Sequence, residues 1–337
     1  MTVPAIPSNV QPFFVGLNTV YDAAYASPAV PVWHTKVFGV HPMSSEREGF
    51  GWLGTLDRAR LWNGNRKIHQ LTPQTYYLTE QPFELSFSID KFRVSNDQFG
   101  LYAPGVQRMA TAMAKLWDYE GRDLLCSLGN WSGTAAQAGL DGLSHWNTAH
   151  PVNIYNAAMG TYCNDFGTAG VSINGVTVGG YFNQNSYATL RAEFMSRKSE
   201  NGEAFGLDPN LLMVGPQLDY VARTVLNATF IAPQTVNAAT QSITMVGPND
   251  NVGLRGTADV LVNKDLVAAG TPNVWYLLAT NHGVMPFTIG LRQAPVFQYL
   301  ISESDMPVFN AHQYVYGAHA RGVPGWSHAW LSARSGV

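Results

Sequence analysis

Charge is scarce in this chain. Lys, Arg, Asp and Glu make up only 13% of its 337 residues, about half the usual ~25%. A free-standing soluble protein needs surface charge to stay in solution. This small share, beside 12% aromatic residues, therefore indicates a surface that is largely covered in use. Composition leaves one alternative open, a β-rich enzyme whose surface is made of Ser, Thr and Asn.

Several features that define other classes of protein are missing. The net charge is −3 and there is no polybasic run, which argues against tight sequence-independent binding to DNA. The two cysteines, Cys126 and Cys163, fit a reducing cytoplasm, and their spacing does not suggest a metal site. No apolar run is long enough to span a membrane. Residues 1–7 lack the basic and apolar regions of a signal peptide.

The stretch from 47 to 94 carries the clearest pattern. Residues 83–90 alternate strictly between apolar and polar, which is the period of a half-buried strand. The apolar residues are Phe83, Leu85, Phe87 and Ile89, and the polar ones are Glu84, Ser86, Ser88 and Asp90. Upstream, Asn63 and Gly64 supply the two positive-φ residues that a tight hairpin turn needs. The sequence therefore predicts a long two-stranded ribbon that has this strand at its root.

The tip of the predicted ribbon is basic and aromatic. Its candidate interface residues are Arg58, Arg60, Trp62, Asn63, Gly64, Arg66 and Lys67. A ribbon this long cannot bury both faces against its own domain, and Arg and Trp often carry interface energy. We interpret the tip as a docking arm for a neighbouring subunit. A solvated hairpin tip is the alternative.

Apolar periodicity predicts most of the other elements. Residues 1–45, broken by prolines, look like an arm with a short amphipathic helix near 10–25. A spacing of three and four residues predicts the longest helix over about 100–127. Asn174 and Gly175 predict a second hairpin. Helices are also expected at 187–199 and from Pro216 to about 226, and strands at 211–216, 258–262, 274–279, 287–292, 313–321 and 329–332.

The sequence contains no familiar catalytic motif. A nucleophile elbow, a phosphate-binding loop and a dinucleotide fingerprint are all missing. His145 and His150 are the best metal candidates, with Asp141 as an oxygen ligand. Their spacing, however, does not place two imidazoles on one helical face. We therefore expect a structural loop, with no catalytic residue, metal or cofactor. A metal-dependent hydrolase that uses this region is the alternative.

Motifs along nearly the whole chain resemble one known family. They are Phe50-Gly-Trp-Leu-Gly-Thr-Leu, Arg60-Leu-Trp-Asn-Gly-Asn-Arg, Phe83-Glu-Leu-Ser-Phe-Ser-Ile-Asp, Gly100-Leu-Tyr-Ala-Pro, His145 to His150-Pro-Val, Leu211 to Pro216 and Tyr314-Val-Tyr-Gly-Ala-His-Ala-Arg-Gly. Together and in this order they closely resemble the Mu-like prophage major head subunit family. Residues 128–183 and 228–255 are more divergent.

The resemblance implies an α+β fold of the Hong Kong 97 type, the capsid fold of tailed phages. Its expected parts are an N-terminal arm at 1–45, an extended β-hairpin loop at 46–82, a peripheral domain at 83–183 and 256–272 with a long spine helix over about 100–127, an axial domain at 184–255 and 273–310, and C-terminal strands at 311–337. Capsid assembly accounts for an arm, a protruding ribbon, a long helix and a charge-poor surface.

The resemblance also implies a function and partners. The chain would be a major capsid protein that self-assembles into pentamers and hexamers of an icosahedral head around double-stranded DNA. Implied partners are a separate scaffolding protein, a maturation protease, a portal and a decoration protein, with weak, non-specific contact to the packaged DNA. Assembly would take place in the cytoplasm of a bacterial host, and the product would be the virion. A tail-tube or sheath-like structural protein is a further alternative.

The expected docking partner of the basic tip is acidic. The first candidates are carboxylates on the C-terminal half of the spine helix, Asp118, Glu120 and Asp123, and the second are those of the 199–208 segment. The arm and the ribbon are expected to bury little against their own subunit, so that neighbours cover them on assembly.

Overall fold

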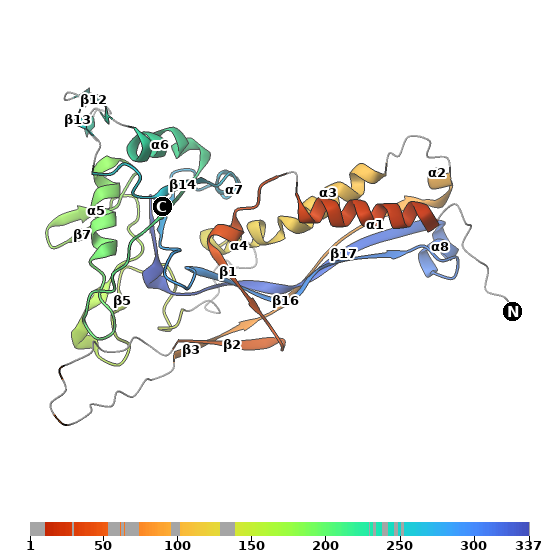
Figure 1. The fold of residues 1–337 in the computed structure, drawn as a ribbon, viewed down its shortest axis with the longest axis horizontal. Helices are drawn as coiled ribbons and strands as arrows, with labels where there is room; N and C mark the ends of the chain where they lie inside the picture. The colour runs from red at the N-terminus through yellow and green to blue at the C-terminus, as the bar shows by residue number, and fades with distance from the viewer. Residues whose placement is uncertain are drawn as a thin grey trace.

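Two four-stranded sheets organise the fold. The computed structural model describes residues 11–28, 30–52, 61, 64, 74–95, 102–128, 139–228, 230–231, 234–237, 242–245, 249–250 and 253–336. Within them the molecule is elongated (Figure 1). A long sheet lies beside helices α1 (Gln11–Ala26) and α3 (Ala103–Ala114), and a second lobe surrounds α5 (Gln184–Met195) and α6 (Asp219–Asn227). The predicted mixture of α and β structure is confirmed.

The long sheet has the strand order β1-β16-β17-β4. Its strands are β1 (Phe38–Pro42), β16 (Phe287–Leu300), β17 (Gln313–Trp326) and β4 (Gln81–Asp90). β1 runs parallel to β16, and the other neighbours are antiparallel. In β4, Phe83 and Phe87 are partly shielded and Ile89 is buried, whereas Ser88 and Asp90 are exposed, as is the apolar Leu85. The strand predicted from the alternation of residues 83–90 is therefore confirmed.

The N-terminal helix α1 lies on α3 and on the long sheet. Leu17 and Tyr21 are buried, and the Tyr21 ring stacks on Phe297 of β16 with 4.7 Å between the centroids. The helix predicted near 10–25 is confirmed. The expectation that the arm buries little against its own subunit is wrong for these residues, because the apolar face of α1 finds its partner within the chain.

The single helix expected over 100–127 is divided into α3 and α4 (Leu116–Cys126). Lys115 separates the two with φ −88° and ψ 0°. Because of this break, the apolar residues of α3 and of α4 pack into different hydrophobic cores. Met109 clusters with α1 and the long sheet, whereas Leu124 joins a core that draws on both sheets. The apolar spacing continues through the break, so periodicity alone predicted one helix.

The second sheet has the strand order β14-β9-β15-β18. Its strands are β14 (Asp259–Val262), β9 (Leu211–Val214), β15 (Trp275–Leu278) and β18 (Ser332–Ser335). Every residue of β9 and β15 is buried. Leu212 packs with residues of α5 and α6, whereas Met213 packs with α4 and the long sheet. The two central strands are thus covered on both faces, which explains their continuous apolar sequences.

The expected division into domains differs from the observed strand pairing. Residues 256–272, assigned to the peripheral domain, contain β14, which pairs with β9 of the second sheet. Residues 287–300, assigned to the axial domain, form β16 in the middle of the long sheet. Residues 139–183 contribute Phe166 to the core of the second lobe. These partners are distant in sequence, so local patterns carried no sign of them.

The turn predicted at Asn174 and Gly175 is confirmed. It joins β7 (Val171–Ile173) to β8 (Val176–Val178), with φ of 51° and 81° at the two turn residues. The strand predicted at 329–332 is wrong at its start, where a 3-10 turn precedes β18. The remaining elements are η1 (His34–Lys36), α2 (Lys91–Ser95), β5 (His150–Pro151), η4 (Ala157–Met159), β6 (Thr161–Tyr162), η5 (Pro216–Leu218), β10 (Phe230–Ile231), β11 (Gln234–Asn237), β12 (Ser242–Met245), β13 (Asn249–Asp250), α7 (Asp265–Ala268), α8 (Met306–Ala311) and η6 (Ala329–Leu331).

Candidate assembly surfaces

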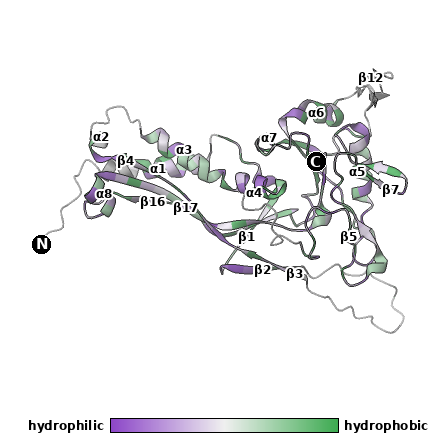
Figure 2. Cartoon of the chain, turned by 180° about the vertical axis from the view of Figure 1, so that it is seen from behind, coloured by the Kyte–Doolittle hydropathy of each residue, from purple (hydrophilic) through white to green (hydrophobic). Residues whose placement is uncertain are grey.

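The ribbon predicted from residue 47 onward begins as a two-stranded sheet. β2 (Arg47–Trp52) pairs antiparallel with β3 (Gln74–Thr79), and Arg47 lies opposite Thr79. The two strands form a sheet of their own beside the long sheet (Figure 1), and β2 is largely hydrophilic (Figure 2). Leu78 is buried, and Phe50 and Tyr76 pack against the core, so the expectation that the ribbon buries little against its own subunit is wrong for its base.

Most of the predicted tip lies outside the described residues, namely Arg58, Arg60, Trp62, Asn63, Arg66 and Lys67. Leu61 and Gly64 are described. Leu61 is 92% exposed, and Gly64 has a φ of 98°. Such a φ suits a turn, because glycine adopts it without steric penalty. The docking role of the tip stays a prediction.

A buried carboxylate holds the root of the ribbon. Glu80 lies between β3 and β4, and its side chain is only 3% exposed. Its Oε1 lies 2.7 Å from Nη1 of Arg292 on β16 and also accepts a hydrogen bond from Arg321 on β17. The Tyr76 hydroxyl donates to the carbonyl of Trp326. Side-chain hydrogen bonds thus connect the root of the ribbon to the long sheet.

Asp118 is wrong as a docking carboxylate, because it is fully buried in its own subunit. Its Oδ1 accepts hydrogen bonds from the backbone N–H groups of Trp33 and His34, at 3.0 and 2.9 Å. The same oxygen lies 2.8 Å from Nδ1 of His34. Asp118 therefore fixes the segment after α1 onto α4 and has no surface to offer a neighbour.

The other two spine-helix carboxylates lie nearer the surface. Asp123 pairs with Arg122 at 2.5 Å, and its side chain is 22% exposed. Glu120 is half-buried. In the second candidate segment, Glu203 is exposed, whereas Asp208 pairs with Arg191 at 2.6 Å. Asp123 and Asp208 already hold cations of their own chain, so docking there would have to displace them.

The exposed, polar face of β4 (its outward row) carries two further acidic residues that could receive the basic tip. Glu84 and Asp90 are exposed on the polar face of that strand. Glu84 accepts a hydrogen bond from the Ser86 hydroxyl, and Asp90 accepts from the backbone N–H groups that begin α2. The strict alternation of residues 83–90 already places Glu84 and Asp90 together on the polar face. This pattern could have identified them as candidate docking carboxylates from the sequence.

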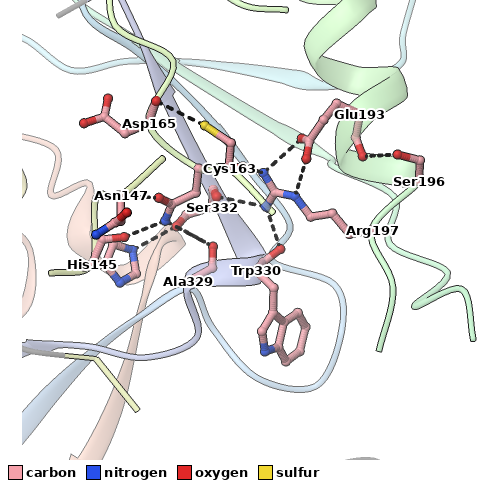
Figure 3. Close-up of polar contacts among 11 residues, drawn as sticks. His145, Asn147, Cys163, Asp165, Glu193, Ser196, Arg197, Ala329, Trp330 and Ser332 are labelled. Carbon is pink, nitrogen blue, oxygen red and sulfur yellow. Dashed lines mark hydrogen bonds and ion pairs between the residues drawn. The ribbon is translucent and has the colours of Figure 1, made fainter. Parts of the chain in front are cut away.

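The region of His145 and His150 is a buried joint. Nε2 of His145 lies 2.9 Å from the Ser332 hydroxyl oxygen (Figure 3), and its ring stacks on Trp326. Burial, and next the basic neighbour His150, hold the pKa of His145 well below its usual value. Nδ1 of His150 lies 2.5 Å from Asp141, and its Nε2 lies 2.9 Å from the His145 carbonyl. Both ring nitrogens of His150 thus lie within hydrogen-bond distance of oxygen atoms of the chain itself.

Arg197 is a buried connector that the sequence did not reveal (Figure 3). All its donor nitrogens are used. They bond to the Glu193 carboxylate and to the carbonyl oxygens of Cys163, Trp330 and Ser332. The end of α5 is thereby tied to β18 and to the segment before β7. Backbone carbonyls carry no residue signature, so no local pattern could have predicted these contacts.

The hydrolase alternative finds little support in this region. In the part of the chain that the structure describes, no three His, Cys, Asp or Glu side chains converge as a metal site requires. The cavity beside Asp141, Tyr162 and Trp330 has a volume of only about 50 Å³. Among the helices that the structure describes, none is long and apolar enough to cross a membrane.

Comparison with solved structures defines the class of fold as that of bacteriophage capsid proteins. A chain of the procapsid of bacteriophage JBD30 is similar with a TM-score of 0.53 and 20% identity, over 99% of this chain and 76% of that one. A chain of the mature capsid of bacteriophage PhiM1 is similar with a TM-score of 0.51 and 11% identity, over 91% and 87%. At these identities the likeness concerns the fold alone.

Sequence comparison then gives the family. The model of the Mu-like prophage major head subunit gpT family matches residues 10–174, 175–249 and 252–335, so the chain belongs to that family. The major capsid protein of Escherichia phage Mu is 30% identical over 84 residues, which are 25% of this chain and 28% of that relative. The predicted resemblance is confirmed, and the family consists of structural head proteins rather than enzymes.

Proposed function

We propose that this major head subunit self-assembles into pentamers and hexamers that close an icosahedral shell around double-stranded DNA. The observation that carries the proposal is the match of nearly the whole chain to the head-subunit family, on a fold shared with chains of assembled capsids. The elongated body, the two-stranded ribbon and the low charge content are consistent with a subunit that is covered by its neighbours.

In this proposal the two lobes have the roles that the Hong Kong 97 fold gives them. The lobe built on the long sheet, with α1, α3 and α4, is the peripheral domain. The lobe built on β14, β9, β15 and β18 is the axial domain around the capsomer centre, and it includes 139–183 and 256–272. Strand pairing supports this revised division.

The ribbon is the arm that reaches the neighbouring subunit. Its basic tip seeks exposed carboxylates, and Asp118 is no longer a candidate because it is buried. Glu120 and Asp123 remain, and Glu84 and Asp90 on the outward row of β4 join them because both are exposed. Each exposed pair contributes only about 0.2–1 kcal/mol, but a shell repeats the contact in every subunit.

Other partners follow from a head of this kind. They are a separate scaffolding protein, a maturation protease, a portal and a decoration protein, and the packaged DNA is contacted weakly and without sequence preference. Assembly takes place in the bacterial cytoplasm. The net charge of −3 supports the weak contact with DNA, because tight binding requires many basic contacts to phosphate.

Negative-stain electron microscopy of the purified chain tests the proposal. Closed shells or rings of five and six subunits are expected. Filaments would instead favour the tail-tube alternative, and discrete single subunits at all concentrations, both with and without the scaffolding protein, would overturn self-assembly. Co-expression with the scaffolding protein of the same phage serves as the second condition, because a subunit that needs a scaffold forms shells only then.

A further inference from the structure

The ribbon joins the long sheet at two places, through residues 43–46 between β1 and β2 and through the single residue Glu80 between β3 and β4. β3 ends at Thr79 and β4 begins at Gln81, so any change in direction between them falls on Glu80. The backbone N–H of Glu80 donates to the carbonyl of Glu46 at 2.9 Å, which closes the base of the ribbon. The bond between Glu80 and Glu46 brings the two connections together, so the geometry around Glu80 bears on the direction in which the ribbon leaves the body.

The Glu80 carboxylate is clamped from the sheet side. Arg292 and Arg321 both donate to its Oε1, and they come from the adjacent strands β16 and β17. Charge-assisted hydrogen bonds of this kind are directional as well as strong. Because the Glu80 side chain is only 3% exposed, water competes little with these two hydrogen bonds. A rotation of the ribbon about Glu80 would break at least one of the two bonds.

A β-bulge makes this clamp possible. The register passes from Leu291 opposite Gly322 directly to Gln293 opposite Arg321, so Arg292 is an extra residue on β16. A bulge re-aims a side chain out of the normal alternation of a strand. Arg292 and Arg321 are not register partners, yet both reach the same oxygen.

Apolar packing at the root does not fix an angle by itself. Leu78 is buried against Gly325, where an added Cβ would lie 2.7 Å from a Leu78 methyl carbon. Apolar contact is non-directional, so it holds the ribbon close without setting its orientation. The Tyr76 hydroxyl makes one hydrogen bond to Trp326. The bonds from Arg292 and Arg321 to Glu80 supply the larger directional constraint.

We propose that Glu80, held by Arg292 and Arg321, is the positioning residue that presets the angle of the ribbon before assembly and thereby the angle between neighbouring subunits. The inference rests on the proposed function, because the ribbon matters as an arm only in a shell. A preset arm gives every subunit the same contact geometry, and a uniform contact geometry gives shells of one diameter.

Spin-label distances in the isolated subunit test the clamp directly. Labels are placed at Thr75→Cys on the ribbon and Ser88→Cys on β4, two exposed sites, in a background with Cys126→Ser and Cys163→Ser. Glu80→Gln should broaden the distance distribution between the labels, while the circular dichroism spectrum stays that of the parent. Arg292→Gln, which leaves the bond from Arg321, should broaden it less and serves if Glu80→Gln fails to fold.

The matched control is Glu46→Gln, an exposed residue at the same base whose carbonyl contact is left intact. It should leave the distribution narrow. In electron micrographs, Glu80→Gln should replace a single shell diameter by several, and Glu46→Gln should not. An unchanged distribution and one shell diameter for Glu80→Gln would overturn the inference, while wild-type shells would still support the proposed function. If the wild type forms no shells even with the scaffolding protein, the proposed function fails, and the spin-label distances still decide whether Glu80 sets the angle.

Discussion

His145 lies flat against Trp326, with 4.2 Å between the ring centroids and 10° between the ring planes. Trp326 ends the long strand β17, and the chain crosses from there to β18 of the other sheet. The neutral imidazole thus packs like an aromatic ring in the core shared by the two lobes. This position makes the joint between the lobes sensitive to acid.

Stability should fall as the pH drops below about 6.5. The pKa of His145 is lowered well below its usual value, and burial lowers that of His328 from 6.5 to about 4. The unfolded chain therefore binds more protons than the folded one below the unfolded pKa, and stability is lost as pH falls from 6.5 toward the folded values. His328 alone accounts for about 3 kcal/mol over this range.

Urea denaturation at pH 7.5 and pH 5 measures this loss. His328→Gln should reduce the difference in unfolding free energy between the two pH values. His41→Gln, at an exposed histidine, should leave it unchanged. Equal slopes of stability against pH for the wild type and His328→Gln would show that this buried histidine does not govern the acid response.

Two glycines in the spine helices should respond to substitution in opposite directions. A Cβ at Gly121 of α4 would lie 2.9 Å from the ring of Phe38, whereas a Cβ at Gly105 of α3 meets nothing within 4 Å. Gly121→Val should therefore destabilise the subunit by about 1–3 kcal/mol through overpacking. Gly105→Ala should stabilise it by up to about 1 kcal/mol. Thermal unfolding of both variants checks the signs, and a neutral Gly121→Val would mean that Phe38 moves freely aside.

Removal of the Asp118 carboxylate should release the segment that follows α1. Asp118→Ala leaves two buried backbone N–H groups, those of Trp33 and His34, without their acceptor. Each unsatisfied donor costs about 1–3 kcal/mol. The variant should lose several kcal/mol and gain a protease-sensitive site near residue 30. Asp123→Ala, which removes a surface pair, should cost no more than about 1 kcal/mol. A wild-type melting curve for Asp118→Ala would contradict this role.

Charge reversal at the ribbon tip should separate folding from assembly. Arg60→Glu combined with Arg66→Glu should leave the subunit folded by circular dichroism and stop shell formation, because the tip would then repel acidic partners. Glu120→Lys with Asp123→Lys should partly restore shells if the spine helix is the partner. Glu84→Lys with Asp90→Lys should do so if the partner is β4. Normal shells from the double variant at moderate salt would identify the tip as a solvated hairpin.

Local patterns predicted the elements whose signal lies within a few residues. Asn174 and Gly175 specify their turn through the φ values that they tolerate, and the alternation from Phe83 to Asp90 specifies a strand whose polar face is exposed. The helix α1 was equally visible. Its docking on its own subunit was not, since the apolar face shows only that a partner exists and does not identify it.

The burial of individual charged residues could not be predicted from the sequence. Asp118 looked like a surface carboxylate because it neighbours Glu120 and Asp123, yet its partner His34 comes from a distant segment. Glu80 is flanked by the polar residues Thr79 and Gln81, so nothing local marks it as buried. Burial of a charge depends on which segments the fold brings together, and that information is long-range.

The order in which the chain is made has a consequence for its folding. α1 leaves the ribosome early, but Tyr21 packs on Phe297, and β1 and β4 need β16 and β17 as their strand partners. Closing such long loops is slow, because their entropy is lost before the contacts form. The long sheet therefore has to form after translation is nearly finished, and until then its apolar strands are substrates for chaperones and for aggregation. The yield of soluble subunit should depend on chaperone supply more than on the strength of any single contact in the finished fold.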